Sequence, residues 1–150
     1  MTIIAWDGKT LAADKASTDV GYLRTVTKIF RVPGGVVAFA GSAANALALL
    51  EWFRAGRDVA KWPKTQEDGD QAASALFADE NNFLWRYSTT PYPERSEDPF
   101  DAIGSGRDYA LAAMHLGHSA RVAVEVACAL DNSCGKGVDS MEPKFIAEAA

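Results

Sequence analysis

Residues 1–40 alternate short apolar segments with turn residues, and this pattern constrains the fold more than any other feature of the chain. The turn signals are Asp7-Gly8 and Pro33-Gly34-Gly35. Apolar segments this short, bounded by such turns, are typical of strands that pair antiparallel with their neighbours. We expect strands over residues 2–6, 11–13, 27–32 and 36–40.

The period of the apolar residues changes after Gly41. The residues that follow the i, i+3, i+4, i+7 spacing of one helix face are Ala46, Leu49, Leu50 and Phe53. This spacing predicts a helix of about three to four turns, and Ser42 is placed to cap its start. Residues 56–71 mix charges with Pro and Gly without an apolar period, so we expect a surface loop there.

The second half of the chain also has strands before helices. We expect a hairpin of strands over 75–78 and 83–87, an exposed connection over 88–99 and a further strand over 100–103. Two helices follow, one over 107–114 and one after the cap candidate Ser119. Strands that come first, with helices on two separate sheet faces, predict a layered α+β sandwich. With 150 residues and 48% hydrophobic content, we expect a single domain over residues 1–150.

Composition argues against several classes of protein. Fifteen basic and twenty acidic residues give a net charge of -5 without a basic cluster, so we expect no nucleic-acid partner. No stretch approaches the roughly 20 apolar residues that span a bilayer, so we expect a cytoplasmic protein with no membrane partner. Cys128 and Cys134 fit neither a zinc knuckle nor a redox pair. His115 and His118 lack a metal-binding partner at suitable spacing, so we expect no metal and no cofactor.

The second residue of the chain is a candidate nucleophile. Removal of Met1 would leave Thr2 as the first residue of a strand. A threonine hydroxyl is a poor nucleophile unless a base lies beside it, and an N-terminal residue carries such a base as its own α-amine. The pKa of a free α-amine is about 7.7 to 8.0, low enough for the amine to accept a proton at working pH.

Five short motifs of the chain are, in order, Thr2-Ile3-Ile4-Ala5, Ala13-Asp14, Thr27-Lys28-Ile29, Ala38-Phe39-Ala40-Gly41 and Ile103-Gly104-Ser105-Gly106. Taken together, they resemble the proteasome β-subunit family, and most closely its bacterial HslV-type members. The resemblance runs from Thr2 to about Asp139. It implies the four-layer αββα sandwich of N-terminal nucleophile hydrolases and the chemistry of a threonine peptidase.

The resemblance also implies roles for three residues around the nucleophile. Thr2 matches the family nucleophile, and Lys28 matches the lysine next to it. A nearby cation disfavours a second positive charge, so Lys28 would lower the pKa of the Thr2 amine. Asp14 matches the carboxylate that pairs with this lysine, and we expect the two side chains to pair inside adjacent strands. A structural salt bridge without catalytic function is the alternative for this pair.

Further matches extend the predicted site. Gly41 matches the glycine whose backbone N–H faces the developing oxyanion, although the residues alone would also suit a strand-to-helix hinge. Ser105 matches a serine near the threonine amine, and Asp131 matches an acidic residue beside it; both would orient the amine and relay protons. The family has a serine in the place of Cys134. Because a thiol is a weaker hydrogen-bond donor, this polar network would be altered.

The resemblance implies a substrate site as well. Thr18 matches a position that holds the substrate backbone, and Phe39 and Ala43 fall where the side-chain pocket is lined. An apolar preference at the cleavage site would follow. The implied partners are a peptide or unfolded protein substrate, further copies of the chain in a homo-oligomer, and an ATP-dependent unfoldase.

One departure concerns the outer helices. The family has two long helices between the strand that ends at Gly41 and the hairpin around Asn81, whereas only the first is visible here. We therefore expect one outer helical layer to be shortened. Because those helices contribute to subunit contacts in the family's rings, a standard stacked ring does not follow from the sequence.

Two other functions stay open. A catalytically inactive assembly or scaffold protein would keep the fold and retain Met1. A small-amide hydrolase would have a closed pocket in place of an open cleft. A phosphate loop at Gly104-Ser105-Gly106 is disfavoured, because Tyr109 stands where a dinucleotide fingerprint needs its third glycine.

Overall fold

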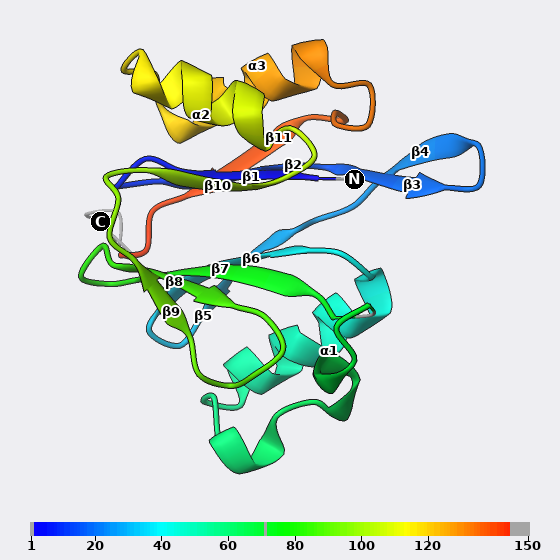
Figure 1. The fold of residues 1–150 in the computed structure, drawn as a ribbon, viewed down its shortest axis with the longest axis vertical. Coiled ribbons are helices and arrows are strands. Elements are labelled where there is room, and N and C mark those ends of the chain that lie inside the picture. Colours follow the sequence, from blue (N-terminus) through cyan, green and yellow to red (C-terminus); the bar gives the residue numbers. More distant parts are fainter. Residues whose placement is uncertain (1, 71, 145–150) are drawn as a thin grey trace, which may run out of the picture.

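Two antiparallel sheets lie face to face at the centre of the molecule in a computed structural model, which describes residues 2–70 and 72–144 (Figure 1). The first sheet has the order β10-β1-β2-β11, formed by Asp101–Gly104, Ile3–Trp6, Leu11–Asp14 and Val138–Met141. The second has the order β5-β6-β7-β8-β9, formed by Ile29–Val32, Gly35–Ala40, Ser74–Asp79, Leu84–Tyr87 and Glu94–Ser96. The strands expected from the turn signals in residues 1–40 are thus present, with the third beginning at Ile29.

Apolar residues on both faces of the central strands form three layers of hydrophobic core, one between the two sheets and one between each sheet and its helices. In β1, Ile4 and Trp6 face the second sheet, whereas Ile3 and Ala5 face the helices on the outer side. Successive side chains in a strand point to opposite faces, so a strand buried on both sides needs a continuous apolar run. This explains why β1 lacks the polar alternation of a surface strand.

Helices cover the outer face of each sheet, as the sequence predicted (Figure 1). On the first sheet lie α2, Arg107–His115, and α3, Ala120–Leu130. The predicted cap of α3 is confirmed, because the Ser119 hydroxyl accepts a hydrogen bond from the Val122 N–H at 3.2 Å. On the second sheet lies α1, Ala43–Arg54, which starts after Ser42. The expected capping bond is wrong, because the Ser42 side chain makes no such hydrogen bond within the described residues.

The outer layer beside α1 is short. The sequence predicts that this layer lacks a second long helix. Two 3-10 turns, η1 at Val59–Lys61 and η2 at Lys64–Glu67, occupy the segment instead. Gln66 holds this segment against the sheet: its side-chain amide accepts from the Ala73 N–H and donates to the Ala73 and Ser88 carbonyls, at 2.7, 2.7 and 2.9 Å. A polar side chain can be buried where its hydrogen bonds are made, as those of Gln66 are. The shortened layer is therefore pinned by hydrogen bonds.

Four strands lie in segments where the sequence predicted none. A two-stranded hairpin, β3 at Ala16–Asp19 and β4 at Tyr22–Thr25, projects from one side of the sandwich (Figure 1). β9 lies inside the segment expected to be an irregular connection, and β11 follows Gly137. No helix in the described ranges has both the length and the apolar character needed to cross a membrane.

Candidate active site

A lysine joins the candidate nucleophile to a buried carboxylate. The Lys28 Nζ donates to the Thr2 Oγ1 at 3.0 Å and to the Asp14 Oδ1 at 2.6 Å. Thr2 is 7% exposed, Lys28 8% and Asp14 0%. The expectation that this pair lies in adjacent strands is wrong: Asp14 ends β2 of the first sheet, whereas Lys28 immediately precedes β5 of the second. The ion pair therefore crosses the gap between the sheets.

Backbone donors surround the Asp14 carboxylate. Its Oδ1 accepts from the Ile3 N–H at 3.2 Å, and its Oδ2 accepts from the Gly135 N–H at 3.1 Å and the Ala16 N–H at 3.4 Å. A buried charge is tolerated only where it is paired and hydrogen-bonded, and this carboxylate meets both conditions. Because the Ile3 N–H is next to Thr2 in the chain, the carboxylate also fixes the backbone that carries the hydroxyl.

The end of β10 packs directly against Thr2. The Ser105 hydroxyl donates to the Thr2 carbonyl oxygen at 3.5 Å. Gly104 has a φ of 111°, and a Cβ there would overlap the Thr2 carbonyl. Only glycine adopts this conformation without strain and leaves this space, so the Gly104-Ser105 pair closes one wall around Thr2.

Asp131 and Cys134 lie behind Ser105, which links them to Thr2. The Cys134 Sγ is 3.7 Å from the Ser105 Oγ and donates to the Asp131 Oδ2 at 3.5 Å. Hydrogen bonds from the Ser133 N–H and hydroxyl, and from Ser105, lower the pKa of Asp131 to about 2. Burial raises the pKa of the Cys134 thiol to about 11, so the thiol stays neutral at working pH and can donate.

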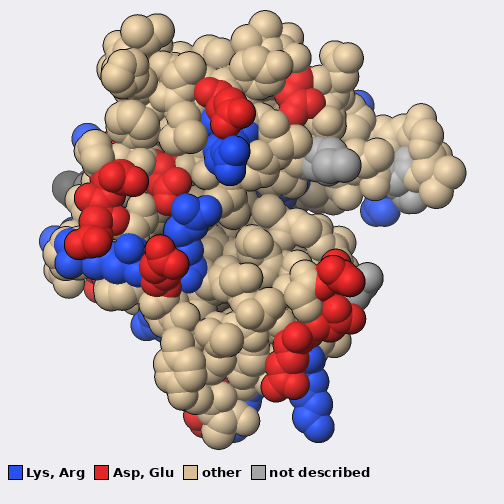
Figure 2. Space-filling model, viewed as in Figure 1, with Lys and Arg blue, Asp and Glu red and all other residues tan. Residues whose placement is uncertain are grey.

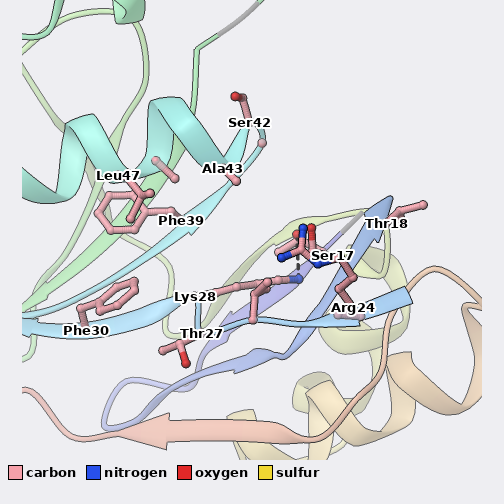
Figure 3. A pocket seen from close by; sticks show the side chains of 15 residues that line it. Ser17, Thr18, Arg24, Thr27, Lys28, Phe30, Phe39, Ser42, Ala43 and Leu47 are labelled. Carbon is pink, nitrogen blue, oxygen red and sulfur yellow. Dashed lines mark hydrogen bonds between the residues drawn. The ribbon is translucent and has the colours of Figure 1, made fainter. Parts of the chain in front are cut away.

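A cleft of about 530 Å³ opens in front of Thr2 (Figure 3). Five other residues of the predicted site line this cleft, namely Thr18, Lys28, Phe39, Gly41 and Ala43. Gly41 has a φ of 106° at the turn from β6 into α1. Ser105, Asp131 and Asp14 do not line the cleft but lie behind Thr2 or Lys28.

The two ends of the cleft differ in chemistry. Phe30, Phe39 and Leu47 form an apolar end between the second sheet and α1, whereas Ser17, Thr18 and Arg24 of the hairpin form a polar end (Figure 3). The Lys28 side chain reaches between the two. The cleft can therefore hold an extended molecule with an apolar group at one end and polar groups at the other.

Sequence reasoning missed several of these residues. Arg24 lies in the hairpin that was not predicted, and Gly135 reaches Asp14 from a loop far along the chain. Leu47 lies four residues after Ala43 on the predicted helix, whereas Phe30 of β5 shares a sheet face with Phe39 of β6 only through the pairing of the two strands. Helical periodicity could thus have found Leu47, but no local signal points to Phe30, Arg24 or Gly135.

No group of three His, Cys, Asp or Glu side chains within the described parts of the chain is placed to hold a metal ion. His115 ends α2, and His118 follows it on the surface. Both cysteines are free thiols.

Comparison with known proteins gives fold matches alone. No protein-family model matches the chain, and no curated protein matches it in sequence. Three similar solved structures are eukaryotic HslV from Trypanosoma brucei (TM-score 0.68, 21% identity, covering 93% of this chain and 97% of that one), Thiobacillus denitrificans BPH in complex with epoxomicin (0.69, 22%, 96% and 99%), and Thiobacillus denitrificans BPH (0.69, 24%, 95% and 98%). The expected αββα sandwich with a shortened outer layer is thereby confirmed.

Proposed function

We propose that this chain, which shares its fold with HslV and BPH, is an N-terminal threonine peptidase. The observation that carries the proposal is the Lys28 ammonium, which is buried 3.0 Å from the Thr2 hydroxyl and held by Asp14. A charged lysine beside a threonine hydroxyl at the edge of an open cleft supplies the electrostatics that an N-terminal nucleophile needs.

The proposal requires that Met1, which lies outside the described residues, is removed. Thr2 would then carry a free α-amine whose ordinary pKa is about 7.7 to 8.0. The adjacent Lys28 cation disfavours a second positive charge, so the pKa of this amine falls and the amine is unprotonated at neutral pH. The terminal amine can then act as the general base for its own hydroxyl.

In the proposed reaction, the Thr2 Oγ1 bonds to the carbonyl carbon of the scissile peptide while its proton passes to the Thr2 amine. The Gly41 N–H stabilises the oxyanion. The carbon–nitrogen bond then breaks, the amine gives its proton to the leaving nitrogen, and an ester to Thr2 remains. Water attacks this ester with the same amine as base, which releases the acid and restores the hydroxyl.

Ser105 and Asp131 support the amine in this scheme. Ser105 already contacts the Thr2 carbonyl, and Asp131 is the charged end of the chain of contacts through Ser105 and Cys134. We propose that Ser105 orients the liberated amine and that Asp131 keeps Ser105 oriented. The Cys134 thiol takes part as a neutral, weak donor.

The substrate we propose is a peptide or an unfolded segment of a protein. Thr18 would hold its backbone, and Phe39 and Ala43 would receive the apolar side chain that precedes the cleaved bond. As in the expectation from sequence, we propose a cytoplasmic homo-oligomer served by an ATP-dependent unfoldase. A purified protein that is active on folded substrates as a monomer, without any ATPase, would contradict the assembly part of this proposal.

Intact mass and peptide turnover test the chemistry. We expect the purified protein to have lost the mass of one methionine and to cleave a fluorogenic peptide that has leucine before the cleaved bond. Thr2→Ala should reduce turnover by at least about 10³-fold, because no other hydroxyl replaces the nucleophile. Circular dichroism should show that this variant is folded.

Equal turnover by the parent protein and Thr2→Ala would exclude the mechanism. A parent protein that keeps Met1 and cleaves no peptide would support the catalytically inactive scaffold. Hydrolysis of small amides without cleavage of peptides would support the small-amide hydrolase.

A further inference from the structure

A second cleft, of about 400 Å³, opens between the two sheets beside β8 and β10. Its lining residues come from the start of β7, the end of β8, the segment 88–94 that leads into β9, and Ile103 of β10. None of its described lining residues belongs to the cleft in front of Thr2. The function proposed above therefore leaves this second cleft unused.

One wall of the second cleft adjoins the nucleophile. Ile103 lines this cleft, and Gly104, the next residue, packs so closely against Thr2 that an added Cβ would overlap the Thr2 carbonyl. The strand pairing agrees, because Gly104 pairs with Ile3, the residue after Thr2. Thr2 therefore lies at the border of the two clefts.

The opposite wall adjoins the proposed oxyanion donor. Ser74 lines the second cleft and pairs with Ala40, the residue before Gly41. A Cβ added to Gly41 would lie 3.3 Å from the Ala73 Cα, so the two backbones are in contact there. The carbonyl that Thr2 attacks and Gly41 stabilises would therefore lie at the same border.

We propose that the second cleft is a leaving-group site, which binds the part of the peptide that follows the cleaved bond. This inference rests on the proposed peptidase function and locates the second half of its substrate. With the apolar side chain against Phe39 and the scissile carbonyl between Thr2 and Gly41, the residues before the bond fill the first cleft. The residues after the bond must leave across the border, where the second cleft receives them.

The walls of the leaving-group site suit an extended, uncharged peptide segment. Exposed hydroxyl side chains line it at Ser74, Ser88 and Thr90, and each can donate to or accept from a backbone amide. Arg86 and Glu94, which pair across β8 and β9, give its described lining both signs of charge. Basic and acidic side chains likewise lie next to one another over β8 and β9 in the space-filling view (Figure 2). A peptide with neutral side chains after the cleaved bond is therefore the substrate we expect.

Binding on both sides of the reacting carbonyl bears on the kind of hydrolase. A hydrolase of small amides gains nothing from a site beyond the leaving nitrogen. A peptidase that cleaves within a chain can use binding energy from both halves of its substrate to lower the barrier to reaction. The two clefts therefore favour cleavage inside a chain.

Peptides of different length test the leaving-group site. We would measure kcat/KM for amidated peptides that share one leucine–alanine bond and the residues before it, and that carry either one or four alanines after the leucine. The scissile bond is the same in both, and the C-terminal amide removes the terminal charge. We expect the parent protein to cleave the longer peptide at least about fivefold better, because the added residues bind in the leaving-group site.

Two variants alter the site in opposite ways. Thr90→Trp fills it, and we expect this variant to reduce the advantage of the longer peptide to less than about twofold. Tyr92→Ala removes a lining side chain that is 70% exposed, so it tests the site even if Thr90→Trp fails to fold, and it should also lower the advantage.

The control is Thr65→Trp, at an exposed position of η2 outside both clefts. We expect this variant to keep the full advantage of the longer peptide. If Thr65→Trp and Thr90→Trp reduce the advantage equally, it does not arise in the second cleft, and the assignment is wrong.

A binding measurement separates failure of this inference from failure of the peptidase mechanism. Fluorescence anisotropy of the two peptides, labelled at the N-terminus, is read on Thr2→Ala with and without Thr90→Trp. Tighter binding of the longer peptide that Thr90→Trp abolishes supports the leaving-group site even if the parent protein cleaves nothing. Cleavage that depends on Thr2 but treats both lengths alike overturns the inference. Binding that is equal for both lengths, or absent up to about 1 mM, on the order of a weak substrate's KM, also overturns it.

Discussion

At the scale of single residues, the site depends on a lysine and an aspartate buried together between two sheets. The pair is bonded at 2.6 Å, and the carboxylate is fully buried. Removing one member of a buried pair leaves an uncompensated charge, which is far costlier than removing one member of a surface pair. The stability of the fold and the proposed chemistry are therefore coupled through the same two side chains.

Lys28→Ala tests this coupling. We expect the variant to lose about 3–5 kcal/mol in the free energy of unfolding, because Asp14 would lose its cation, and to lose peptide turnover as well. Urea titration gives the first quantity and the fluorogenic peptide the second. The matched control is Lys15→Ala, which breaks the 2.8 Å pair with Asp139, a partly exposed pair, and should cost under about 1 kcal/mol. Equal losses in the two variants would show that burial between the sheets is unimportant.

A second prediction concerns Gly104. Gly104→Ala should destabilise the protein by more than about 2 kcal/mol, because the new Cβ would overlap the Thr2 carbonyl in addition to straining a backbone with a φ of 111°. The control, Gly117→Ala, has a φ of 95° and no atom within 4 Å of the added Cβ, so only the strain of about 1 kcal/mol applies. Thermal unfolding of both variants measures the difference, and equal melting temperatures would remove the packing argument.

At the scale of elements, sequence patterns predicted those strands and helices that bury an apolar face. The run Ile3–Trp6 and the stripe on α3 are examples, because their periods follow directly from packing on both sides or on one side. The β3–β4 hairpin was missed because it is largely exposed, with Val20 at its tip 99% exposed, and carries no apolar alternation. β9 and β11 are short strands at sheet edges, where pairing with a neighbour decides the conformation.

The same contrast holds for the site. A resemblance of motifs predicted Thr2, Asp14 and Lys28, and the structure brings these three together. The sequence could not predict that Asp14 and Lys28 belong to different sheets, since strand pairing depends on contacts between distant segments. It also could not predict Gly135, whose N–H reaches Asp14 across 121 residues of chain.

The 3-10 segment yields a prediction at this scale. Gln66→Ala removes three hydrogen bonds and leaves the buried Ala73 N–H unsatisfied, so we expect a loss of about 2–4 kcal/mol in the free energy of unfolding. Urea titration measures this loss. Thr65→Ala, at the exposed neighbouring position, should change stability by less than about 0.5 kcal/mol. If Gln66→Ala leaves the free energy of unfolding unchanged, the aromatic contacts of Trp52 and Trp62 with Tyr87 hold the short layer without Gln66.

At the scale of the whole molecule, the cleft forms where the two sheets, α1 and the β3–β4 hairpin meet beside Thr2. Thr2 immediately precedes β1 of the first sheet, Phe39 belongs to the second sheet, Ala43 to α1 and Thr18 to the hairpin. The helices α2 and α3 lie behind the first sheet and stay outside the cleft. A change that fills the cleft should therefore block substrates without affecting either sheet.

Ala43→Phe makes such a change. Ala43 is exposed in the first turn of α1 and lines the cleft, so a phenyl ring there should lower kcat/KM for the leucine peptide at least about tenfold while the free energy of unfolding changes by less than about 0.5 kcal/mol. The control is Ala44→Phe, at the next exposed position, which does not line the cleft and should keep full activity. If both phenylalanine variants keep full turnover, peptides reach Thr2 by a route other than this cleft.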